Sequence, residues 1–168
     1  MSAKDMANRR QELLFQLLRR SMALADQTAF EATTEDWQWL YQAVRQQSLT
    51  GVIFLAVSKL PSGQQPPMEL AMQWMSEAEV IRGLNELQNS EAARLTKLFS
   101  EQGRQTAILK GQANARLYPD KLSRQPGDID IWVEGGQKSV LDLLISIGLL
   151  DEVPTTANAG KHGKATIG

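Results

Sequence analysis

The sequence contains no cysteine and only one histidine, His162, among its 168 residues. Without cysteine the chain cannot form disulfides, cysteine-ligated zinc sites or a thiol nucleophile. One histidine cannot build a histidine-rich metal site, and a Ser-His-Asp triad would depend on it alone. These two scarcities exclude the commonest thiol and imidazole sites.

The sequence also lacks a large net charge and long apolar runs. A net charge of −1 and a pI near 5.9 do not indicate the positive charge that binding to long nucleic acid requires. No segment approaches the roughly 20 apolar residues of a membrane span, and the N-terminal pattern is that of an amphipathic helix rather than a signal peptide. With 42% hydrophobic and 22% charged residues, we expect a globular cytoplasmic protein that does not contact a membrane.

The first part of the chain, residues 1–103, has the patterns of a helical region. Apolar residues recur at helical spacing over residues 7–25, after Thr34 as an expected N-cap, over residues 51–60, and from Met68 to Glu101. Gly103 is the expected C-terminal cap of the long helix. Three of the four tryptophans lie in this region, and we interpret them as core residues.

The second part, residues 104–168, changes to alternating strands and helices. We expect a strand over residues 105–109, a helix over 112–117, a strand over 128–133, a helix over 140–148 and the start of a third strand over 149–153. The fold class predicted for the whole chain is therefore α+β, with a helical N-terminal region followed by an α/β core.

The most informative segment is Gly127–Val133, which reads Gly-Asp-Ile-Asp-Ile-Trp-Val. On a strand, Asp128 and Asp130 share one face with Trp132, while Ile129 and Ile131 share the other. Two neighbouring carboxylates repel one another and are costly to bury, and a divalent cation resolves that conflict. Carboxylate oxygens are ligands that Mg²⁺ accepts, with nucleotide phosphates filling its remaining positions.

Further residues at fixed offsets from this strand resemble a known family. Leu109-Lys110-Gly111 ends the first expected strand, Tyr118-Pro119 ends the following helix, and Arg124 lies in the loop before Asp128. This set is similar to the nucleotidyltransferase superfamily of polymerase-beta-like fold. More narrowly it resembles the bacterial uncharacterised nucleotidyltransferases, which carry a Lys-Gly after the first strand, an Arg before the Asp-x-Asp strand and a variable helical region in front of the core.

The resemblance implies metal-assisted transfer of a nucleoside monophosphate from an NTP to a hydroxyl acceptor, with Mg²⁺ or Mn²⁺ as cofactor. Asp128 and Asp130 match the catalytic, metal-binding aspartates, and Gly111 matches the phosphate-cradling glycine. Lys110 and Arg124 are candidate contacts to the nucleotide by charge. The acceptor is not specified by the sequence and could be a small molecule, a protein or RNA.

Two departures from the superfamily pattern keep alternatives open. Gly111 is followed by Gln112 instead of serine, and the superfamily's third carboxylate has no match. We expect that acid on a strand beyond Gly168, so residues 104–168 would be the N-terminal part of the core. The alternatives are a non-catalytic relative that acts as a helical binding or assembly module, and a helical adaptor in which the two aspartates are surface acids.

Overall fold

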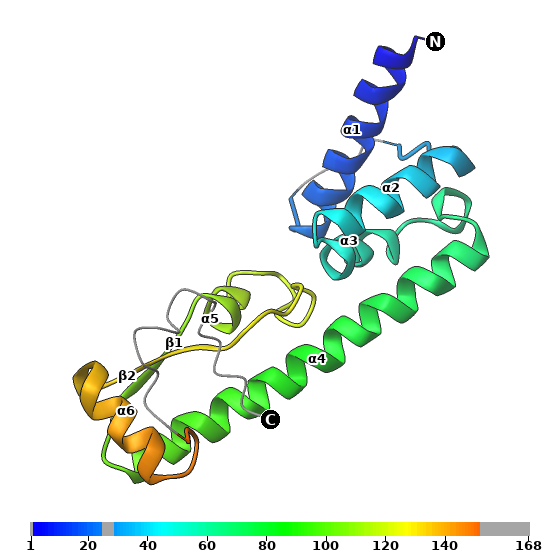
Figure 1. The fold of residues 1–168 in the computed structure, drawn as a ribbon. Helices are drawn as coiled ribbons and strands as arrows, with labels where there is room; N and C mark the ends of the chain where they lie inside the picture. Colours follow the sequence, from blue (N-terminus) through cyan, green and yellow to red (C-terminus); the bar gives the residue numbers. More distant parts are fainter. Residues whose placement is uncertain (1, 25–28, 152–168) are drawn as a thin grey trace. The chain divides into compact units, whose positions relative to one another are not determined.

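The computed structural model describes residues 2–24 and 29–151 (Figure 1). The chain forms two compact units: residues 1–92 with 108–130, and residues 93–107 with 131–168. These units cut across the predicted boundary after residue 103, and the division into a helical region and a catalytic core stays a prediction. None of the helices in the described residues is long and apolar enough to cross a membrane.

Most of the described chain is helical. The first unit contains α1 (Ala3–Ser21), α2 (Thr34–Gln46), α3 (Thr50–Val57), the short 3₁₀ helix η1 (Ser62–Gln64), most of α4 (Met68–Glu101) and α5 (Gly111–Ala115). The second unit contains the end of α4 and α6 (Gly136–Ser146), and the strands β1 (Thr106–Leu109) and β2 (Asp130–Val133) contribute residues to both units.

Capping side chains set where the first two helices begin. Ser2 and Asp5 form a reciprocal capping box, so α1 begins at Ala3 rather than at the predicted residue 7. Thr33, not the predicted Thr34, caps α2, because its hydroxyl accepts a hydrogen bond from the amide of Asp36 at 3.2 Å. Both predictions placed the helix correctly and its first residue incorrectly.

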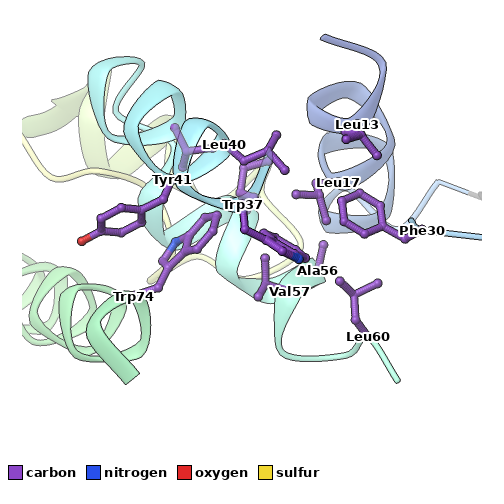
Figure 2. Close-up of a cluster of buried hydrophobic side chains, with 12 residues drawn as sticks. Leu13, Leu17, Phe30, Trp37, Leu40, Tyr41, Ala56, Val57, Leu60 and Trp74 are labelled. Carbon is purple, nitrogen blue, oxygen red and sulfur yellow. The ribbon is translucent and has the colours of Figure 1, made fainter. Parts of the chain in front are cut away.

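The core of the first unit is an aromatic and aliphatic cluster among α1, α2, α3 and the start of α4 (Figure 2). Trp74 of α4 is fully buried, and its indole N–H donates to the Thr50 carbonyl at 3.0 Å. Its ring meets those of Trp37 and Tyr41 edge-on. The prediction that Trp37 and Trp74 are core residues is confirmed.

Helix α4 has the predicted bounds and runs unbroken from Met68 to Glu101 (Figure 1). Pro66 and Pro67 precede it, and Gly103 follows it with a φ of +71°, a conformation that favours glycine. No strand occurs among residues 2–24 and 29–103, as predicted. Along the sequence, the first strand follows directly after this long helix.

The sheet contains β1 and β2, which pair side by side. The pair is antiparallel, because the Glu134 amide bonds the Gln105 carbonyl at one end while Lys110 meets Asp130 at the other. The α+β class is confirmed. The predicted third strand does not begin at Leu149, since residues 149–151 are irregular; residues 152 and 153 lie outside the described part of the chain.

Candidate active site

The turn after β1 is the first component of the site. β1 ends at Leu109, Lys110 has a φ of +46° and a ψ of −125°, and α5 begins at Gly111. A positive φ is uncommon for a residue with a side chain and costs about 1–3 kcal/mol. Strain of this kind is retained where the surrounding structure needs an abrupt change of chain direction. Here it turns the chain at the end of β1 that lies beside Asp130.

Gly111 lies between two of the predicted site residues. A Cβ atom on Gly111 would stand 3.4 Å from the carbonyl oxygen of Asp128 and 3.9 Å from Nη1 of Arg124. The strand end, the acidic segment and the loop arginine therefore meet at this glycine, although they are separated in the sequence.

The two aspartates lie at the start of β2. Asp128 and Asp130 are exposed, Ile129 and Ile131 are half-buried, and Trp132 is exposed, so the expected alternation of the two faces is present. One detail of the prediction was wrong: the strand begins at Asp130 instead of 128, because β1 has already turned away at Lys110. The isoleucines keep part of their surface exposed, since the sheet has two strands within the described residues.

Lys110 and Asp130 form an ion pair across the end of the sheet. The Lys110 ammonium is 3.8 Å from Oδ2 of Asp130, and the two side chains are 77% and 47% exposed. Such an exposed pair contributes little to stability, in the range of about 0–1 kcal/mol. The lysine can therefore exchange this carboxylate for another anion at low cost.

Arg124 presents a different electrostatic environment. Its Nη1 atom is buried, lies beside Gly111 and has no hydrogen-bond partner among the described residues. A buried N–H group without an acceptor costs about 1–3 kcal/mol, and more when the group is charged. An oxyanion placed at Gly111 would remove that cost.

The loop that carries Arg124 is held by polar residues of α4, which sequence reasoning missed. Nδ2 of Asn85 donates to the carbonyls of Leu122 at 3.0 Å and of Arg124 at 2.7 Å. Gln88 donates to the Gly127 carbonyl. The available signal was the position of these amides, since they interrupt the apolar spacing of α4 between Ile81 and Ala92.

The acidic pair gives a minimal donor set for a metal ion. No cluster of three or more acidic, histidine or cysteine side chains that could hold a metal occurs within residues 2–24 and 29–151. Mg²⁺ is commonly held by one or two carboxylates, with waters and substrate phosphates completing six-coordination. Asp128 and Asp130 fit this mode of binding, in which the nucleotide supplies part of the coordination shell.

Taken together, the fold and the site define an α+β protein with an acidic pair, a glycine turn and two cations at one end of a sheet. The model of the uncharacterised nucleotidyltransferase family matches residues 33–159, well over half of the chain. The chain belongs to this nucleotidyltransferase family. The match includes α2, α3 and α4, so this part of the helical region is shared with the family, whereas α1 precedes the matched residues. Searches of curated proteins and of solved structures give no significant match.

Proposed function

We propose that this protein transfers a nucleoside monophosphate from an NTP to a hydroxyl acceptor, with Mg²⁺ or Mn²⁺ as cofactor. The family supports nucleotidyl transfer in general, and the site residues support the finer assignment. The observation that carries it is the buried Nη1 of Arg124 beside Gly111 and Asp128, for which the described part of the chain supplies no hydrogen-bond acceptor. A guanidinium in that state favours an anion such as the triphosphate.

In the reaction a new phosphorus–oxygen bond forms as another phosphorus–oxygen bond breaks. The acceptor oxygen attacks the α-phosphorus, the bond from that phosphorus to the bridging oxygen breaks, and pyrophosphate leaves with the bond's electron pair. The proton of the acceptor hydroxyl passes to solvent or to a base. Asp128 and Asp130 would hold the divalent ion, which when bound neutralises phosphate charge and fixes the triphosphate's orientation.

The cations of the site would act on the leaving pyrophosphate. Arg124 provides a fixed donor, because its loop is held by Asn85. Lys110 provides a movable charge, because its pairing with Asp130 is long and exposed. With Asp130 holding the metal, Lys110 would be available to pair with the phosphates instead. In this proposal Asp128 and Asp130 would bind the metal, and Arg124 and Lys110 would bind the triphosphate.

A direct test is to incubate the purified protein with each α-³²P-labelled NTP, Mg²⁺ or Mn²⁺, and cell lysate fractionated into small molecules, RNA and protein. We expect label to enter one fraction and to be absent with Asp128→Asn/Asp130→Asn. Labelling by that double variant at the wild-type rate would contradict the proposal.

A second candidate is a relative that binds nucleotide without catalysis. The specific observation in its favour is that the acidic pair is not joined by a third carboxylate in the described residues. In that case the protein would bind Mg·NTP with loss of affinity in the double variant, while no acceptor fraction would become labelled.

A further inference from the structure

A buried amide in the middle of the longest helix takes no direct part in the reaction described above. Asn85 is 0% exposed, and it lies on α4 between the apolar residues Ile81 and Ala92. An asparagine in a helix interior is less favourable than most residues, and burying its amide costs free energy unless it is hydrogen-bonded. Its use at this position therefore needs a specific reason.

The reason is the set of carbonyls that its side chain reaches. Nδ2 donates to the carbonyl of Ile81 within the helix at 2.9 Å. It also donates to the carbonyls of Leu122 and Arg124 at 3.0 and 2.7 Å, in the loop between α5 and Asp128, which we call the site loop. An amide has two N–H groups, so both are used and one is shared. The loop carbonyls are thus tied to one rigid point on α4.

A second amide one turn further along the helix holds the other end of the same segment. Gln88 donates to the carbonyl of Gly127, the residue immediately before Asp128. Gln112 of α5 in turn donates to Oδ1 of Asn89 at 2.8 Å. Asn85, Gln88 and Asn89 of α4 therefore contact both sides of the site. Asn85 and Gln88 bind the loop that carries Arg124, and Asn89 binds α5, the helix that begins at Gly111.

We propose that Asn85 is a positioning residue, which fixes the main chain at Arg124 so that the guanidinium lies beside Gly111. This role rests on the proposed function, in which the Arg124 guanidinium binds the triphosphate. Helix α4 fixes the position of the loop through the hydrogen bonds of Asn85. Leucine at position 85 would have the same branching and the same number of side-chain heavy atoms, although it is larger, and it would leave the carbonyls of Leu122 and Arg124 without these donors.

The experiment compares Asn85→Leu with Val44→Ala, a variant in the buried core cluster of the helical region. Hydrogen exchange of the peptide over residues 120–128 should quicken by about tenfold in Asn85→Leu, as expected for loss of the holding bonds. The Kd for Mg·NTP should rise by about tenfold relative to wild type. Val44→Ala should lower the melting temperature and change neither the loop exchange nor the Kd.

A double-mutant cycle tests whether Asn85 acts through Arg124. In the Arg124→Leu background, Asn85→Leu should weaken nucleotide binding no further, since the two residues form one unit. Independent, additive losses of affinity would overturn the positioning role, as would wild-type loop exchange in Asn85→Leu. If wild type binds no NTP, the proposed function fails, and the exchange measurement alone still decides whether Asn85 holds the loop.

Discussion

Gly51 of α3 packs directly against the carbonyl group of Ser123, with no room between them for a side chain. A Cβ atom on Gly51 would overlap the Ser123 oxygen and lie 3.2 Å from its carbonyl carbon. Ser123 belongs to the loop between α5 and the acidic segment, so a helix from the first half of the chain contacts the site loop. The helical region is therefore part of what shapes the site.

Gly51→Ala should displace the loop and weaken both folding and nucleotide binding. Overpacking of this kind costs about 1–3 kcal/mol, and thermal unfolding measures it. The control is Gly83→Ala on α4, where an added Cβ meets nothing within 4 Å. Because alanine is the better helix former by about 1 kcal/mol, Gly83→Ala should be neutral or stabilising. Equal destabilisation by the two variants would show that the Gly51 contact has no special role.

Arg124→Leu should separate stability from binding. The variant removes a guanidinium whose Nη1 is buried without a partner among the described residues, so its melting temperature should be unchanged or higher. Its affinity for Mg·NTP should fall by at least about tenfold, the scale of one charge-assisted hydrogen bond. Isothermal titration and thermal unfolding of the same samples provide both quantities. A destabilised variant with wild-type affinity would be the opposite result.

Stability should fall at acid pH because of Asp36. Burial raises the pKa of this carboxyl, but hydrogen bonds from Thr33, Arg9 and Arg10 outweigh it and lower the pKa to about 2. Because the folded pKa is below the unfolded value of 3.8, the stabilisation is present above pH 4 and is lost as pH falls toward 2. The difference corresponds to about 2 kcal/mol.

Urea unfolding between pH 2 and pH 6 measures this loss. Asp36→Asn should flatten the profile in that window, whereas Glu35→Gln, at an exposed acid one residue earlier, should leave it as in wild type. An unchanged acid profile in Asp36→Asn would show that other groups control acid unfolding.

The sequence predicted the elements whose signals are local. The bounds of α4 follow from Pro67 in front and Gly103 behind, each of which acts through its own backbone. The family resemblance assigned Gly111 and Asp128 to one nucleotide site, and the structure brings these two residues together. The start of β2 was misplaced because it depends on where β1 turns away, which is set by the positive φ of Lys110.

The sequence did not predict how the site loop is held. Asn85 and Gln88 have the appearance of ordinary polar residues on an amphipathic helix, and their importance arises only when a loop about 40 residues later docks on them. In the same way, Gly51 shows no need for glycine until the Ser123 carbonyl packs against it. Contacts of this kind are tertiary, and the local pattern shows at most that the apolar spacing of α4 is interrupted, not which loop packs there.

The most direct test of the central claim is the thermal shift produced by Mg²⁺ or Mn²⁺ with an NTP. Ligand at about ten times its Kd should raise the wild-type melting temperature by about 3–6 °C. Asp128→Asn/Asp130→Asn should remain folded by circular dichroism and lose the shift, while Asp142→Asn, at an exposed acid on α6, should keep it. An equal shift in the double variant would place the metal and nucleotide elsewhere and contradict the account.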